Sequence, residues 1–308
     1  MKRKQRFIDS YVVNQDKLID KKKIYPRDAS SILGVNEYKG IMSLYKEIAE
    51  YDYYEAELDV TYQMELGSKL KDFVANEFSI RTDKKVRNIN GLLVNDKYPF
   101  SVGKVDKAIV SEKAFLECIV TNSFVKNAWN TIPPMYEVKC HHNMAISGAT
   151  HCYIAVLIGN EKLIIHELKR DEGMINNIMK AEKMFYDECI INKKEPLPDG
   201  DIEYSSYLKE KYKNSKDDSL ILFIEDDKLK RYDELVDNIK SLQREKTSIE
   251  QYIQNEMKEY ETAYLHDRKI TWKNISKNIL DTKLIKKEHP ELVSKFMKTT
   301  TSRVFKIN

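Results

Sequence analysis

The sequence predicts an α+β protein in two parts, a core over residues 1–200 and a helical extension over residues 201–308. Two apolar runs with only three residues between them indicate an antiparallel hairpin inside the core. Apolar residues recur at helical spacing on both sides of that hairpin, and a long helix of near-heptad spacing follows residue 200. The turn-forming stretch from Pro196 to Gly200 marks the boundary between the two parts.

The predicted hairpin joins a run from Ser101 to Val110 with a run from Ala114 to Val120. Asp106 lies in the first run and Glu117 in the second, so we expect the two carboxylates to face one another. A helical segment from Met135 to Ile146 follows, and we expect it to lie over both acids.

The remaining elements follow from spacing and turn residues. Helices are expected where apolar residues recur every three or four positions, and strands where short apolar runs end at Gly or Asn. The predicted helices are 26–33, 41–58, 64–78, 174–191 and 229–260. Two strands are predicted within 80–97, one on either side of Asn90-Gly91. Two more are predicted at 152–158 and 163–168, joined by a turn at Gly159-Asn160.

Composition supports a buried core and a reducing, cytoplasmic setting. Of the 308 residues, 42% are hydrophobic, and the basic N-terminus lacks the apolar stretch of a secretory signal. No run approaches the roughly 18 apolar residues that a membrane helix needs. The cysteines, Cys118, Cys140, Cys152 and Cys189, form no CxxC pair, which favours free thiols over a disulfide framework.

Charge is distributed unevenly along the chain. The net charge is only +3, but Tyr264 to Asn308 holds 11 lysine and arginine residues against 4 acidic ones. A basic region of this kind suits an acidic polymer, so we expect weak DNA binding through the C-terminal region. The histidine and cysteine grouping of the core lacks the spacing of a zinc site, and no zinc is predicted for His141, His142, His151, Cys140 and Cys152.

Asp106 and Glu117 are the residue types that a metal-dependent nuclease places on such a hairpin. Carboxylates hold Mg²⁺, which activates water and shields the charge that builds on the phosphate during phosphodiester cleavage. Such sites usually carry a lysine two residues after the second acid, on the same strand face. That position is Ile119 in this chain.

Several separated motifs, in the same order along the chain, resemble the YqaJ viral recombinase family. That family is related to lambda exonuclease and belongs to the PD-(D/E)xK nuclease superfamily. The residues that carry the resemblance are Ile32-Leu33-Gly34 with Asn36 and Tyr38, Gly67, Glu117 with Asn122, Tyr136 with His142 and Met144, Arg170-Asp171-Glu172, Ile270 to Lys273, Asp281, and Arg303 to Ile307. The resemblance covers residues 20–308 and implies a PD-(D/E)xK nuclease-like core, a central mixed sheet flanked by helices, with a helical C-terminal extension.

The resemblance also implies an active site of five residues, of which this chain keeps Asp106 and Glu117. Lys71 stands where the family has a metal-binding glutamate, Ile119 where it has the lysine, and Lys139 where it has a glutamine. Two unit charges about 4 Å apart interact by about 4 kcal/mol at an effective dielectric of about 20. We therefore expect two internal salt bridges and no cofactor, with Asp106 and Glu117 serving as Mg²⁺ ligands only in an active enzyme.

Three functions remain open. The leading hypothesis is an inactivated phage-type exonuclease homologue that binds DNA or a protein partner, for example a host defence complex that it inhibits. The alternative is an active Mg²⁺-dependent 5′ to 3′ DNA exonuclease that uses Lys139 or Lys71 as a migrated lysine and works with a single-strand annealing protein. The third is a structural subunit of a homo-oligomer or mixed oligomer. Under each hypothesis we expect a protein of phage or prophage origin that acts in the bacterial cytoplasm and has no membrane partner.

Overall fold

The computed structural model divides the chain into two compact units, Met1–Tyr212 and Lys213–Asn308. It describes residues 12–13, 22–49, 61–222, 226–266, 268–298 and 301–307. None of the helices in these ranges is long and apolar enough to cross a membrane.

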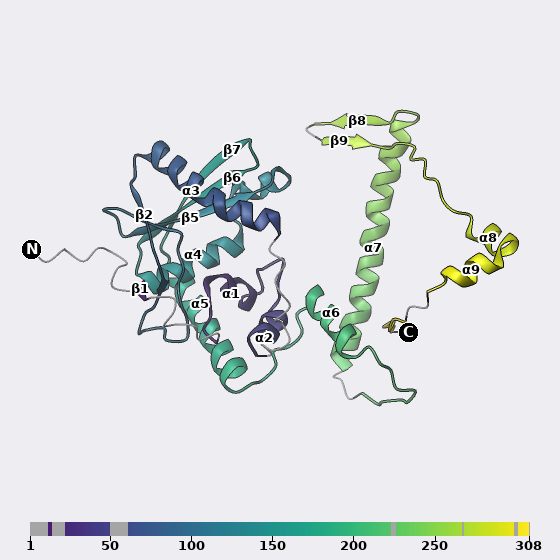
Figure 1. Cartoon of the computed structure of the whole chain (residues 1–308), viewed down its shortest axis with the longest axis horizontal. Coiled ribbons are helices and arrows are strands. Elements are labelled where there is room, and N and C mark those ends of the chain that lie inside the picture. Colours follow the sequence, from purple (N-terminus) through teal and green to yellow (C-terminus); the bar gives the residue numbers. More distant parts are fainter. Residues whose placement is uncertain are drawn as a thin grey trace, which may run out of the picture. The chain divides into compact units, whose positions relative to one another are not determined.

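The first unit is built on one five-stranded mixed sheet, which confirms the predicted α+β class (Figure 1). Its order is β2-β4-β5-β6-β7, and the β5–β6 pair is parallel while the other pairs are antiparallel. The strands are β2 (Val86–Asn88), β4 (Lys107–Ile109), β5 (Ala114–Thr121), β6 (His151–Ile158) and β7 (Lys162–Lys169).

The parallel β5–β6 pair requires a crossover, and the chain makes it through η3 (Ser123–Asn130) and α4 (Pro134–Ser147). Pro134 occupies the first turn of α4, where its missing N–H has no cost. Gly148 ends the helix at a φ of 71°, in the left-handed region that glycine adopts without strain. This crossover places α4 beside the strand that carries Glu117, as predicted.

One predicted strand boundary is wrong by several residues. The first run of the hairpin was expected from Ser101, but β4 begins only at Lys107. Ser101 instead forms an isolated bridge with Ile24, and Gly103 forms one with Leu93. These bridges draw the segment before Asp106 away from the main sheet.

The strands predicted on either side of Asn90-Gly91 are both present, but they do not pair with each other. β2 joins the main sheet, whereas β3 (Leu92–Leu93) pairs with β1 (Val12–Val13). The hairpin predicted at Gly159-Asn160 is confirmed, because β6 and β7 pair along their full length.

The helices agree with their predicted positions, with shifted ends. α3 continues four residues beyond the expected end at Phe78, and the predicted 174–191 helix ends in a π-helical turn, η4 (Tyr186–Ile191). The part of the 41–58 prediction beyond residue 49 lies outside the described residues. The helices of the first unit are α1 (Pro26–Ile32), α2 (Ile41–Ala49), α3 (Tyr62–Thr82), α4, α5 (Glu172–Phe185) and α6 (Ile202–Lys211).

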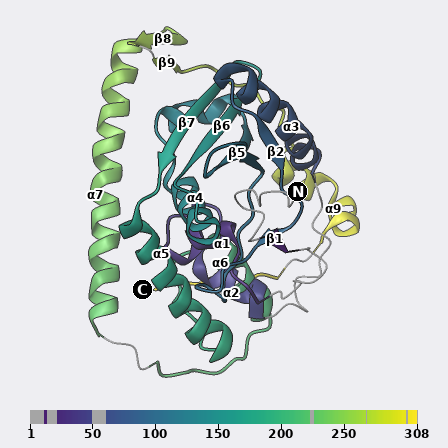
Figure 2. The same cartoon turned by 90° about the vertical axis from the view of Figure 1, so that its left-hand side faces the viewer.

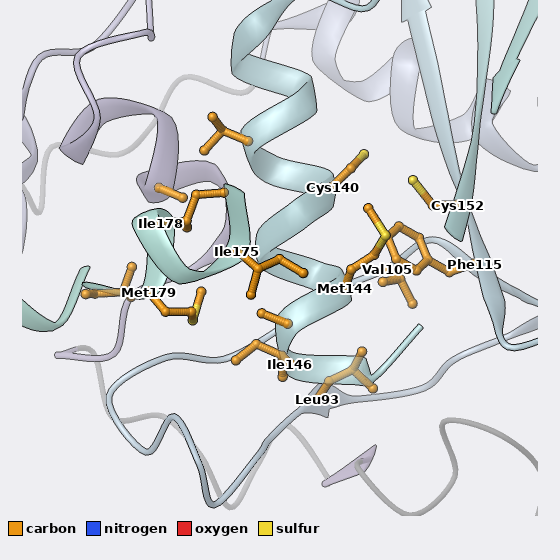
Figure 3. Close-up of a cluster of buried hydrophobic side chains, with 14 of the residues drawn as sticks. Leu93, Val105, Phe115, Cys140, Met144, Ile146, Cys152, Ile175, Ile178 and Met179 are labelled. Carbon is orange, nitrogen blue, oxygen red and sulfur yellow. The ribbon is translucent and has the colours of Figure 1, made fainter. Parts of the chain in front are cut away.

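The two faces of the sheet carry separate apolar clusters. Phe115 and Ile154 pack with Met144 of α4 and Ile175 of α5 on one face, part of which is drawn in Figure 3. Leu116, Cys118 and Tyr153 pack with Val74 and Phe78 of α3 on the other. Because successive residues of a strand point to opposite faces, Glu117 shares the α4 face with Phe115 and Ile119.

The first helix of the second unit is α7 (Asp226–Met257), the long helix that the sequence predicts. A hairpin of β8 (Thr262–Leu265) and β9 (Arg268–Thr271), which periodicity did not predict, follows at the C-terminal end of α7 (Figure 2). Two short helices, α8 (Thr282–Glu288) and α9 (Pro290–Phe296), complete the unit.

Candidate functional site

One pocket of the first unit gathers four of the five positions at which the family resemblance implies an active site. Lys71 of α3, Glu117 and Ile119 of β5, and Lys139 of α4 all line this pocket, whose volume is about 560 Å³. Asp106, which immediately precedes β4, reaches the group through its contact with Lys71. We call these five residues the lysine-filled site.

Asp106 is held by a side chain and by the neighbouring strand. Its Oδ1 lies 2.7 Å from Nζ of Lys71, and its Oδ2 accepts a hydrogen bond of 2.8 Å from the backbone N–H of Cys118. Both oxygens therefore have partners. The Lys71 side chain is 40% exposed and that of Asp106 is 19% exposed, so water screens this ion pair in part.

Glu117 is more deeply placed. Its side chain is 2% exposed, and Oε1 accepts a hydrogen bond from Nζ of Lys139 in an ion pair. Its second oxygen, Oε2, is buried and finds no hydrogen-bond partner among the described residues. Buried polar atoms are rarely left in this state, because each unmade hydrogen bond costs about 1–3 kcal/mol.

The charges of this inner pair depend on one another. Burial raises the pKa of Glu117, and the ammonium group of Lys139 only partly opposes that rise. Burial lowers the pKa of Lys139, but the carboxylate of Glu117 outweighs it, so the pKa of Lys139 is raised overall. Each group would be costly to bury as an ion without the other.

Ile119 occupies the position of the expected lysine, two residues after Glu117 on the same face of β5. Its side chain packs in the apolar cluster shared by the sheet and α4, and only 7% of the residue is exposed. The chain instead presents lysines from two helices, α3 and α4.

The donor set of the lysine-filled site does not fit a divalent cation. Mg²⁺ in such sites is held by carboxylates and water, and a cation nearby opposes its binding. Here both oxygens of Asp106 and one oxygen of Glu117 already accept hydrogen bonds, two of them from ammonium groups. Within the described ranges, no group of three or more His, Cys, Asp or Glu side chains is placed to hold a metal ion.

A curated relative resembles this chain over nearly its whole length. The model of the YqaJ-like viral recombinase domain matches residues 21–150. The Bacillus subtilis (strain 168) protein YqaJ is 33% identical over 298 residues, which cover 94% of this chain and 92% of that protein. This chain belongs to the YqaJ-like viral recombinase family.

Two solved exonuclease structures resemble this YqaJ-like chain at lower similarity. An alkaline exonuclease, LHK-Exo, from Laribacter hongkongensis is 14% identical, with a TM-score of 0.47 over 61% of this chain and 93% of that one. A phage-related exonuclease from Haemophilus somnus 129PT is 13% identical, with a TM-score of 0.45 over 56% of this chain and 96% of that one.

The histidines and cysteines considered above for zinc do not form one cluster in this YqaJ-like chain. His151 contacts Glu112 at 3.1 Å, whereas His142 lies in the core against Glu182. His141 directs Nδ1 to the backbone carbonyl of Glu137. Cys140 and Cys152 pack in the apolar cluster drawn in Figure 3.

A second buried polar network was missed by the sequence analysis. Glu182 of α5 faces Nδ1 of His142 at 2.6 Å and accepts a hydrogen bond of 2.6 Å from the hydroxyl of Ser101. Nε2 of His142 faces the carbonyl oxygen of Val102 at 2.9 Å. Burial lowers the pKa of His142, but Glu182 outweighs it and the pKa is raised overall.

A signal for this network was present in the sequence. Glu182 is four residues after Ile178 and three before Phe185, so it interrupts the apolar face of the predicted 174–191 helix. A single acid on such a face predicts a buried partner, because an unpaired buried carboxylate is costly. The partner was not identifiable, since His142 comes from a different helix.

Proposed function

We propose that this chain is a non-catalytic member of the YqaJ-like viral recombinase family that binds DNA without degrading it. The observation that carries the proposal is the pair of contacts from Lys71 to Asp106 and from Lys139 to Glu117. Two ammonium groups stand where a nuclease of this kind requires one divalent cation.

The electrostatics of the site support this reading. A divalent ion that entered between Asp106 and Glu117 would have to displace both ammonium groups or bind beside them. Breaking a buried ion pair by removing one partner typically costs about 3–5 kcal/mol. Removing Lys139 from the buried carboxylate of Glu117 approaches this cost, whereas the more exposed Lys71–Asp106 pair contributes about 1 kcal/mol or less.

One feature of the site favours the alternative of an active exonuclease. Lys71 and Lys139 both line the pocket beside Glu117, so a lysine is available to assist attack even though the β5 position is Ile119. An active enzyme would still need metal ligands, and a divalent ion would have to compete with both ammonium groups for the two carboxylates. Metal binding therefore distinguishes the two functions.

The proposed DNA surface lies in the second unit. Arg268, Lys269 and Lys273 are exposed on and after β9, next to the exposed rings of Tyr264 and Trp272. Tyr264 is directly opposite Lys269 in the hairpin register. Basic groups contact phosphates without regard to sequence, and exposed aromatic rings can stack on unpaired bases.

The metal part of the proposal is tested by calorimetric titration and thermal melting with Mg²⁺ and Mn²⁺. We expect no saturable heat and no rise in melting temperature at millimolar metal. A ligand that binds only the native state must stabilise it, so a rise that Asp106→Ala abolishes would contradict the proposal. Asn95→Ala, which is outside the pocket lining, serves as a substitution control.

The DNA part is tested separately by fluorescence anisotropy with a labelled duplex and a labelled single strand. We expect weak binding to both that weakens steeply with salt. Replacing Arg268, Lys269 and Lys273 with alanine should reduce it, whereas replacing Lys240 and Arg244 on α7 should not. If binding is undetectable at low salt, the protein-partner role is the better reading, with a single-strand annealing protein or a host defence complex as the partner to test.

A further inference from the structure

The second unit exposes two apolar surfaces that do not contact each other in the structure. The first is a cup formed by α8 and α9 with Leu280 and Met297 at its ends, and its volume is about 460 Å³. Its lining includes Leu280, Ile285, Leu292 and Phe296. The second is residues 217–222, which we call the acidic segment. Its Leu220, Ile221 and Leu222 are 82%, 79% and 67% exposed.

The two surfaces have opposite charge. Residues 282–298, which contain both helices of the cup, hold five lysines and two glutamates. Lys286 lines the cup, and Lys283 is exposed one turn before it. The acidic segment begins with Asp217 and Asp218, and residues 217–227 contain five acidic residues and no basic one. An apolar run beside carboxylates therefore matches an apolar cup edged by ammonium groups.

We propose that the cup binds the acidic segment of a second copy of this chain. Leu220, Ile221 and Leu222 would fill the cup, while Asp217 and Asp218 face Lys283 and Lys286. Two copies that exchange segments make the same contact twice, so the assembly closes as a symmetric dimer. Both exposed apolar surfaces are then covered in each copy.

Chain length favours exchange between copies over contact within one copy. The acidic segment ends just before α7, whose 32 residues span about 48 Å at 1.5 Å per residue. The chain leaves the far end of α7, because the N–H of Trp272 is hydrogen-bonded to the carbonyl of Glu261. The eight residues from there to the cup reach at most about 28 Å, and the six residues from Leu220 to Asp226 reach about 21 Å.

Fully extended, the two connecting stretches together span about the length of α7. Contact within one copy would therefore require both stretches to be fully extended, with the loss of their conformational freedom. Contact between copies places no such demand on either stretch. The second copy carries the same cup and the same acidic segment, so both apolar surfaces of each copy are covered.

Sedimentation and light scattering of the full chain test the proposal. We expect a concentration-dependent rise from the monomer mass of 36.2 kDa to twice that mass. Lys283→Glu with Lys286→Glu should raise the dimer dissociation constant by at least tenfold, and Asp217→Lys with Asp218→Lys should do the same. Lys240→Glu with Arg244→Glu on α7 makes the same change of charge and should leave the mass unchanged.

The decisive experiment mixes the two charge-reversal variants, the one with glutamates in the cup and the one with lysines in the acidic segment. In a mixed dimer both exchanged contacts again pair opposite charges, so the mixture should dimerise although neither variant does so alone. A second readout mixes Ile221→Cys with Val293→Cys chains, which should form a disulfide between copies on oxidation. A monomeric wild type, a dimer that neither reversal weakens, or a mixture that stays monomeric would each overturn the proposal.

Discussion

Glu117 and Glu182 are both buried carboxylates that face a basic side chain in the same core, yet their surroundings differ. Glu182 has partners on both oxygens, His142 and Ser101. Glu117 has Lys139 on one oxygen, and its other oxygen is buried without a partner in the described part of the chain. A complete network indicates a structural role. An incomplete one beside a pocket leaves a buried acceptor, Oε2 of Glu117, that the described residues do not satisfy.

The two glutamates differ also in what lies next to them. The His142–Glu182 pair is fully enclosed, with both side chains 0% exposed. Lys139 lines the pocket, and its side chain is 24% exposed. Loss of Glu182 therefore leaves His142 without an anion in the core, whereas loss of Glu117 leaves an ammonium group that can turn toward water.

The largest expected effect comes from the same substitution at the two glutamates. Glu182→Gln should lower the free energy of unfolding by about 2–4 kcal/mol, because the buried ring of His142 must then either stay charged without a partner or give up its proton. Glu117→Gln should change the free energy by about 1 kcal/mol or less, since Lys139 reaches the pocket. Urea unfolding at pH 6 measures both, and the opposite order would contradict the distinction between the two sites.

The inner pair of the lysine-filled site should behave differently when its two partners are removed in turn. Lys139→Met leaves Glu117 buried without a cation and should cost about 2–4 kcal/mol at pH 8. Burial raises the pKa of Glu117, so the folded state of this variant binds a proton more readily than the unfolded state. Its stability should therefore recover as the pH falls toward the ordinary glutamate value of 4.5.

A double variant provides the control for that experiment. Lys139→Met combined with Glu117→Leu replaces the pair with apolar groups of similar size. Such replacements are often neutral or stabilising, so we expect the wild-type stability to return within about 1 kcal/mol at pH 8. A double variant no more stable than Lys139→Met would show that packing, and not an unpaired charge, explains the loss.

The pH dependence of wild-type stability should report the buried His142–Glu182 pair. Glu182 holds the pKa of His142 above its ordinary value of 6.5. A raised pKa contributes stability that is fully present below the unfolded value and is lost as the pH rises through the folded value. Chemical unfolding should therefore show stability declining above pH 6.5, by at most about 1.4 kcal/mol per pH unit. In Glu182→Gln this decline should be absent, and an unchanged slope would assign it to other groups.

The smallest effect is expected at the Lys71–Asp106 ion pair, the outer pair of the lysine-filled site. Lys71→Ala removes a lysine whose side chain is 40% exposed, so the stability should change by about 1 kcal/mol or less. Asp106 keeps the backbone N–H of Cys118 as a partner in this variant. A loss as large as that of Lys139→Met would mean that the outer pair is shielded from water to the same degree as the inner pair.

Local patterns predicted most of the first unit, and long-range contacts decided what they missed. The hairpin that carries Asp106 and Glu117, the helix α4 and the turn at Gly159 all follow from short-range spacing, whereas the parallel pairing of β5 with β6 was not predicted. The pairing of β3 with β1 does not follow from spacing either, because a two-residue strand has no periodicity to indicate its partner. The start of β4 was missed for a similar reason, since bridges to distant residues hold Ser101 and Gly103.

The lysine contacts of the candidate site were predictable because the resemblance aligned each substituted position with a known place in the fold. Lys71 and Lys139 lie on the carboxylates as expected. What no motif indicated was the buried Oε2 of Glu117, which depends on how β5 and α4 pack together. The roles of these residues in DNA processing remain a prediction.

Reconstruction of the active site is the most direct test of the non-catalytic function. Lys71→Glu, Ile119→Lys and Lys139→Gln together return the pattern of the family around Asp106 and Glu117. Residues of one catalytic unit act together and not additively, so no single change should suffice. Circular dichroism first establishes that the triple variant is folded, because Ile119→Lys places a charge in the apolar cluster.

The measurement is the release of nucleotides from linear duplex DNA in the presence and absence of Mg²⁺. We predict no release by the wild-type chain or by any of the three single variants. We predict Mg²⁺-dependent release by the triple variant that Asp106→Ala abolishes. Release by the wild-type chain that Asp106→Ala stops would contradict the non-catalytic function and would show that Lys71 or Lys139 serves as the catalytic lysine.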